Sequence, residues 1–213
     1  MFFLKESLSD HGQPWTELAA SITDNPYGSK LTLKTDIGTG HFKTVEFEDG
    51  LKIVLTDYTI NRDFSKVYDN SSDEHFCLHI NQVKATDKFS VCLSDKELFF
   101  NNKLYSSVFL IRSGEPFEIK TTPGTYFNQL KIVIPKSWPL RHIPEVYNAQ
   151  LLQGYLDLRA ERLYFDSLDG VYLKLVNRLI GEVEQITYLP LVHGIVTIIV
   201  ERFFSRMEAR LAK

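Results

Sequence analysis

The chain has 213 residues, 44% hydrophobic and 24% charged, which is the balance of a globular protein with a sizeable core. Its net charge of −3 and pI of about 6.1 lack the basic excess typical of a domain that grips nucleic acid. Two cysteines, Cys77 and Cys92, provide no disulfide framework. The N-terminus lacks the apolar core of a signal peptide, and no apolar run is long enough to span a bilayer. A cytoplasmic protein without a membrane segment is therefore predicted.

Residues 1–30 are predicted to form an irregular lead-in with one short helix. Pro14 suits a helix start, and Leu18 and Ile22 follow at a spacing of four.

Residues 31–140 are predicted to form an antiparallel β-barrel. Short alternating segments, about eight or nine in number, are separated by turn signals at spacings typical of sandwiches and barrels. The turn at 48–50, "EDG", is a good hairpin signal between two such strands. At Pro135 this pattern gives way to a proline-rich connector.

Residues 141–213 are predicted to be helical, with helices at about 146–163, from near Ser167, and from 188–190 to the last residue. Strands followed by helices define an α+β fold. The second helix carries a heptad-like apolar seam formed by Tyr172, Val176, Leu179, Val183 and Ile186. This seam packs either on the barrel or against a second copy, and we expect it to form a homodimer interface.

The stretch "EHFCLHINQ" places His75, Cys77 and His79 on one face of a strand and Phe76, Leu78 and Ile80 on the other. A zinc ion binds its ligands at about 2.0–2.3 Å, so two neighbours in this row can share a metal but the outer pair cannot. No second His-x-His pair occurs to complete a site. We therefore expect no metal, and we expect the Phe76 face to fill the barrel.

Two other kinds of chemistry are weakly indicated. Cys77 is flanked by histidines that point alongside it rather than at it, which favours an inert cysteine over a nucleophile. Gly38 and Gly40 precede a strand rather than a helix, so they indicate a tight turn rather than a phosphate loop.

A small-molecule pocket in the barrel is the preferred site hypothesis, and the alternative is a core filled by aromatic side chains. Its candidate lining residues are polar or aromatic: Tyr58, His75, Cys77, His79, Arg112 and Phe127. Other aromatic residues of the strands that suit such a pocket are Tyr68, Phe99, Tyr105 and Tyr126.

The segment from Leu31 to Phe64 resembles the sensor region of AraC/XylS-family transcriptional regulators. The matching residues are Gly38, Gly40, Gly50, Leu51, Asp57, Tyr58 and Thr59. Farther on, "LKIVIPKSW" and "VERFFSRM" resemble the end of the sensor barrel and its last helix.

This resemblance implies a cupin-like barrel that binds a small-molecule effector, with helices used for dimerisation. The family reads DNA through two helix-turn-helix units after the sensor. The chain is therefore expected to be a truncation, with a stand-alone sensor as the alternative, and it is not expected to bind DNA by itself. Metal-binding cupins present His-x-His with a later Glu and His, a spacing that His75, Cys77 and His79 do not match. No cofactor and no enzymatic activity are therefore expected, and a cupin-type metal-dependent enzyme acting on a small molecule is the alternative.

Overall fold

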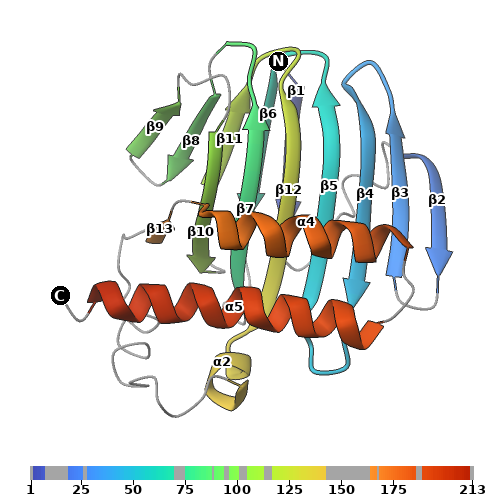
Figure 1. The fold of residues 1–213 in the computed structure, drawn as a ribbon. Coiled ribbons are helices and arrows are strands. Elements are labelled where there is room, and N and C mark those ends of the chain that lie inside the picture. The colour runs from blue at the N-terminus through green and yellow to red at the C-terminus, as the bar shows by residue number, and fades with distance from the viewer. Residues whose placement is uncertain are drawn as a thin grey trace.

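Two β-sheets lie face to face in a computed structural model of the chain, and two long helices cross the outer face of the larger sheet (Figure 1). The structure describes residues 2–7, 19–25, 28–69, 75–87, 89–93, 96–100, 105–112, 117–142, 164–166, 168–185 and 189–211. The predicted α+β class, with strands arranged in sheets and followed by helices, is confirmed.

Within these residues the smaller sheet, sheet A, has five strands. In spatial order they are β1 (Phe2–Ser7), β6 (Phe64–Asp69), β11 (Phe117–Thr121), β8 (Phe89–Leu93) and β9 (Lys96–Phe100). β1 and β6 run parallel, and the other neighbours in this sheet run antiparallel.

The larger sheet, sheet B, is antiparallel throughout and has eight strands in the described part of the chain. In spatial order they are β13 (Tyr164–Asp166), β10 (Tyr105–Arg112), β7 (His75–Lys84), β12 (Tyr126–Pro135), β5 (Lys52–Ile60), β4 (Gly38–Glu46), β3 (Gly28–Lys34) and β2 (Ala19–Asn25).

The hairpin predicted at 48–50 joins β4 to β5 and is fixed by local hydrogen bonds. The N–H of Phe47 donates to the carbonyl of Leu51 at 2.9 Å, and the N–H of Leu51 donates to Oδ1 of Asp49 at 3.1 Å. Gly50 has a φ of +87°, a conformation that costs little without a Cβ. This turn sets the register of β4 against β5.

The described residues contain three helices. α2 (Ser137–His142) lies between β12 and β13 in the chain, and α4 (Gly170–Gln185) and α5 (Leu189–Leu211) follow β13. No described helix combines the length and the apolar character needed to cross a membrane. α4 starts three residues later than predicted, because Asp169 caps it: its Oδ1 accepts hydrogen bonds from the N–H groups of Val171 and Tyr172.

Two hydrophobic clusters lie on either side of sheet B. One lies between the two sheets, inside the barrel, and includes Cys77, Phe109 and Phe127 of sheet B and Phe64 and Ile119 of sheet A. The other lies between sheet B and the helices and includes Leu78 of β7 and Leu179 of α4. Sheet B is therefore buried on both faces over much of its area.

The predicted helix after Pro14 is wrong in its second half, because residues 19–25 form strand β2 paired with β3. A spacing of four between Leu18 and Ile22 also fits the period of two of a strand, and backbone pairing to β3 decides in favour of the strand. The predicted helix at 146–163 lies outside the described residues.

The predicted boundaries at 30 and 140 do not separate structural units. β1 and β2 lie before residue 30 and β13 lies after residue 140, yet all three belong to the two sheets. The predicted connector after Pro135 contains α2.

Gly38 and Gly40 belong to strand β4 and not to the tight turn expected there, which occupies the residues before them. A Cβ on Gly40 would lie 2.2 Å from the carbonyl oxygen of Asp57. The glycines therefore permit close approach of β4 to β5.

Candidate functional site

Strand β7 lies near the centre of sheet B, between β10 and β12. Its side chains alternate between the two hydrophobic clusters: Cys77 belongs to the cluster inside the barrel, and Phe76, Leu78 and Ile80 belong to the cluster under the helices. The predicted orientation of this strand is therefore wrong. Cys77 and His79 face the barrel interior, and the Phe76 face packs against α4 and α5.

The predicted site residues of β7 are deeply placed. Cys77 is fully buried, and His79 is 2% exposed. The imidazole of His79 stacks on the ring of Phe109, its partner in β10, with centroids 5.0 Å apart and planes 3° from parallel. His75, at the start of the strand, is half-buried.

A row of polar side chains crosses the inner face of sheet B next to His79. Asn81 of β7 is paired with Ser107 of β10 on one side and with Gln129 of β12 on the other. Each of the three residues is 6% exposed or less. Ser107 Oγ, Asn81 Oδ1 and Gln129 Nε2 have no hydrogen-bond partner among the described residues. We call these three residues the barrel row.

Other polar groups occupy the same interior. Lys131 is paired with His79 in the register and is likewise buried. On the facing sheet A, Lys66 of β6 and Thr121 of β11 share the inward face with Phe64 and Ile119, and both are buried. Thr121 Oγ1 has no hydrogen-bond partner among the described residues. Both walls of the barrel thus present polar atoms inward.

Aromatic rings fill the end of the barrel beyond the row. The ring of Tyr58 stacks on Phe127 at 4.9 Å between centroids and on Phe42 at 5.3 Å. Phe89 of sheet A meets Phe127 edge-on at 6.0 Å. Tyr58 and Phe127, both predicted to line a pocket, therefore lie inside the barrel, as part of an aromatic stack.

Arg112 is the last residue of β10. Arg112 is paired with Phe76, whereas Cys77 and His79 are paired with Ile111 and Phe109. Of the six predicted residues, the structure brings Tyr58, Cys77, His79 and Phe127 to the barrel interior.

The metal and nucleophile hypotheses gain no support from the described residues. No group of three or more His, Cys, Asp or Glu side chains within them is placed to hold a metal ion. Neither cysteine of the chain forms a disulfide. Cys77, the nucleophile candidate, is fully buried in the cluster inside the barrel, and apolar burial disfavours the accessible thiolate that a nucleophile needs.

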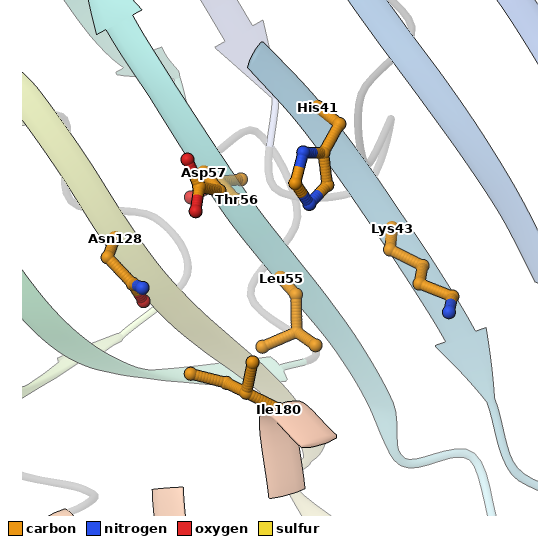
Figure 2. A pocket seen from close by; sticks show the side chains of 7 residues that line it. All are labelled: His41, Lys43, Leu55, Thr56, Asp57, Asn128 and Ile180. Atoms are coloured by element: carbon orange, nitrogen blue, oxygen red, sulfur yellow. The ribbon is translucent and has the colours of Figure 1, made fainter. Parts of the chain in front are cut away.

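A second candidate site lies on the opposite face of sheet B, at the edge of α4 (Figure 2). It is a small, partly open pocket of about 30 Å³, lined by His41, Lys43, Leu55, Thr56, Asp57, Asn128 and Ile180. We call it the helix-side pocket. His41, Asp57 and Asn128 come from neighbouring positions on β4, β5 and β12.

Sequence reasoning missed both the barrel row and the helix-side pocket. The members of the barrel row come from strands far apart in the chain, and in the helix-side pocket the hairpin partners β4 and β5 meet the distant β12 and α4. An alternation argument on β7 alone, extended by two residues from His79, would have included Asn81.

The seam predicted as a dimer interface is used within the chain. Tyr172, Val176, Leu179 and Val183 are buried in the cluster between α4, α5 and sheet B. These four side chains are therefore not available to a second copy, and Ile186 lies outside the described residues.

No protein-family model matches the sequence, and no curated protein matches it. Among solved structures, the chain is similar to the AraC-like transcriptional activator CuxR, with 15% identity and a TM-score of 0.45 over 84% of this chain and 57% of that one. It is also similar to ToxT from Vibrio cholerae O395, solved with a naphthalenyl-butenoic acid bound, with 11% identity and a TM-score of 0.35 over 71% of this chain and 58% of that one. The cupin domain of Schizosaccharomyces pombe Cnp3 aligns at 14% identity and a TM-score of 0.34, covering 58% of this chain and 72% of that one. The chain thus spans little more than half the length of the two regulators.

Proposed function

We propose that the chain is a ligand-sensing domain of a transcriptional regulator, and that its effector binds inside the barrel against the barrel row. The observation that carries this proposal is the set of buried polar atoms on Ser107, Asn81 and Gln129 that have no hydrogen-bond partner in the part of the chain that the structure describes. Leaving such a group unsatisfied costs about 1–3 kcal/mol, and a bound polar molecule removes that cost. The assignment to transcription rests on the sequence resemblance.

The row offers a defined chemistry to a ligand. Asn81 Oδ1 accepts a hydrogen bond, Gln129 Nε2 donates one, and the Ser107 hydroxyl can do either. The stacked rings of Phe109 and His79 form an adjacent flat wall. A small molecule with both donor and acceptor groups and a planar apolar part suits this arrangement.

Strand alternation supplies a route from ligand to helices. On β7, Asn81 points into the barrel while its neighbour Ile80 packs in the cluster with α4 and α5. On β12, Gln129 likewise points into the barrel, and its neighbour Leu130 packs in the cluster under the helices. A ligand that shifts these strands therefore changes the surface on which both helices rest, and a sensor needs such a coupling.

A homodimer remains part of the proposal, with a changed interface. The helices expose two large apolar side chains, Val171 of α4 and Ile198 of α5, which are 48% and 49% exposed. The dimer is expected to use the outward faces of these helices rather than the buried seam.

A thermal-shift screen of a metabolite library against the full chain tests the barrel site. Asn81→Leu removes the central acceptor, and Asn61→Leu is the matched control because Asn61 is exposed after the end of β5 and belongs to neither site. Compounds that stabilise the wild type and the control but not Asn81→Leu support the proposal. Hits that stabilise all three proteins equally, or metal-dependent hits lost on His79→Ala but not on Asn81→Leu, would contradict it.

A further inference from the structure

We infer that Lys43 couples the interior of the barrel to helix α4, so that a ligand which displaces the aromatic rings in the barrel loosens the C-terminal turn of that helix. The rings are those of Phe42, Tyr58 and Phe127, which stack in sequence. We call them the ring stack. The inference rests on the sensing function proposed above and deepens it, because it names the contact through which an occupied barrel acts on a helix.

The ring stack leads from the barrel row to strand β4. Phe127 lies two residues before Gln129 of the barrel row, on the same inward face of β12. Its ring stacks on Tyr58 of β5, which in turn stacks on Phe42 of β4. Gly40 is the residue directly opposite Tyr58, so β4 contributes no side chain at that position. A ligand at the barrel row therefore lies next to a continuous path of rings that ends on β4.

Lys43 continues this path through the sheet. Phe42 belongs to the cluster inside the barrel, whereas Lys43, the next residue, points to the helix side. Its ammonium donates a hydrogen bond to the carbonyl of Val183, in the last turn of α4. Lys43 is only 8% exposed, so its position is fixed by packing as well as by this bond. A shift of β4 that moves Phe42 also moves Lys43, because the two residues share a peptide bond.

The C-terminal end of α4 depends on this cation. Two of its last four residues are glutamates, Glu182 and Glu184, and that turn contains no basic residue. Acidic side chains at a helix C-terminus oppose the helix dipole, and a cation there compensates it. Lys43 supplies the cation from the sheet. The other end of α4 is capped by Asp169, so the C-terminal turn is the end that can loosen alone.

The helix-side pocket lowers the cost of releasing Lys43. The pocket lies between Lys43 on the sheet and Ile180 on α4, and its volume of about 30 Å³ has room for a water molecule (Figure 2). An ammonium that leaves Val183 can therefore be hydrated at this partly open position. A buried cation without any such partner would be strongly unfavourable, and the contact could not then act as a switch.

Hydrogen exchange of the full chain, measured residue by residue, tests this coupling without a ligand. Tyr58→Leu removes the middle ring of the stack and so displaces its neighbours. We expect it to speed exchange of the amides at residues 180–185 about two- to fivefold, the range that a cation at a helix C-terminus is worth. Amides at residues 174–177, nearer the capped end, are the internal reference and should not change.

The same measurement in a Lys43→Met background isolates the transmitting contact. Lys43→Met alone should speed exchange at residues 180–185, and adding Tyr58→Leu should then change it no further. Lys30→Met is the matched control, because Lys30 is exposed and is paired with Lys43 across β3 and β4. In the Lys30→Met background the response to Tyr58→Leu should be intact.

Two results would overturn the inference. One is exchange in α4 that does not respond to Tyr58→Leu. The other is a response of the same size with and without Lys43→Met, as expected if Lys43 only stabilises the helix end. If Tyr58→Leu fails to fold by circular dichroism, Phe127→Leu replaces it, since it removes the neighbouring ring. Neither result affects the thermal-shift screen, which reports binding at Asn81 whether or not Lys43 transmits it.

Discussion

Oδ2 of Asp169 accepts a hydrogen bond from Nη2 of Arg202 at 2.6 Å, and this contact joins the start of α4 to the middle of α5. The other carboxylate oxygen, Oδ1, caps α4. Arg206 also pairs with Asp169, and both guanidinium groups lie over the ring of Tyr172, at 5.3 and 5.6 Å from its centroid. One carboxylate thus fixes the helix pair that covers sheet B.

Asp169→Asn should destabilise the fold by about 1–2 kcal/mol at pH 7, a figure that allows for partial solvent screening of the ion pair. Asparagine still caps a helix, so the loss reports the charge. Burial acts to raise the pKa of Asp169, but hydrogen bonds from the Tyr172 N–H and from Arg202, with the charge of that guanidinium, lower it to about 2. Urea unfolding of wild type and variant at pH 7 measures the difference.

The sign of the pH dependence follows from the lowered pKa. The contribution of Asp169 is complete above the ordinary value of 3.8 and is lost as the pH falls toward about 2. Wild type and Asp169→Asn should therefore converge in stability over that window. Asp36→Asn, at an exposed ion pair with Arg62, is the control and should change little. A stability gap that persists unchanged at pH 2 would contradict this account.

Asp49→Leu should cost about 2–3 kcal/mol, since it leaves buried donors without an acceptor. Oδ2 of Asp49 accepts from Nε1 of the fully buried Trp138 at 2.6 Å and lies 2.9 Å from Nε2 of His193 in α5. Burial opposes ionisation here too, but the hydrogen bonds from Trp138, His193 and the Leu51 N–H prevail and lower the pKa of Asp49. Chemical denaturation followed by tryptophan fluorescence measures the loss.

The conservative variant Asp49→Asn provides the comparison for this network. It keeps an acceptor for Trp138 and should lose only about half as much stability as Asp49→Leu. If both variants lost the same stability, the hydrogen bonds of Asp49 would not contribute, which would contradict this account.

Asn81→Leu should leave the stability of the ligand-free chain unchanged or raise it by about 1–2 kcal/mol. The substitution replaces a buried acceptor that has no partner among the described residues with an apolar group of similar size. Denaturation midpoints without added ligand give the answer. A loss larger than about 2 kcal/mol would identify Asn81 as a structural polar group rather than a ligand contact.

Leu179→Ala should destabilise each chain by about 2–5 kcal/mol, because Leu179 is fully buried between α4 and sheet B. Ile198→Asp should instead leave folding within about 0.5 kcal/mol of wild type and act on assembly. Sedimentation equilibrium should give twice the chain mass of 24.6 kDa for wild type and a single chain mass for Ile198→Asp. A wild type that sediments at the single chain mass at high concentration would refute the dimer.

The local sequence pattern predicted the strands and helices themselves better than the layers against which they pack. The hairpin at 48–50 and the helix ending near the C-terminus depend on nearby residues, and both were predicted correctly. Strand β7 was predicted but placed inside out, because sheet B is buried on both faces and alternation alone cannot tell the barrel from the helix layer. The apolar seam on α4 was likewise predicted correctly as a buried stripe, but it packs against sheet B and α5 rather than against a second copy.

The candidate sites depended on information that a single segment does not carry. Ser107, Asn81 and Gln129 come together through the pairing of β10, β7 and β12, which are separated by tens of residues along the chain. In the helix-side pocket, His41 and Asp57 face each other across the predicted hairpin, but Asn128 joins them only through the pairing of β5 with the distant β12. Non-local register is set by the packing of the whole barrel, so these rows could not be read from the sequence.

Nuclear magnetic resonance of the side-chain amides tests the central claim, a ligand site at the barrel row, most directly. The NH₂ signals of Asn81 and Gln129, assigned by their loss in Asn81→Leu and Gln129→Leu, report contacts inside the barrel. We predict that compounds from a fragment library that bind the chain shift both signals together and leave that of the exposed Asn61 in place. A library that yields binders none of which moves the Asn81 and Gln129 signals would contradict a sensing site in the barrel.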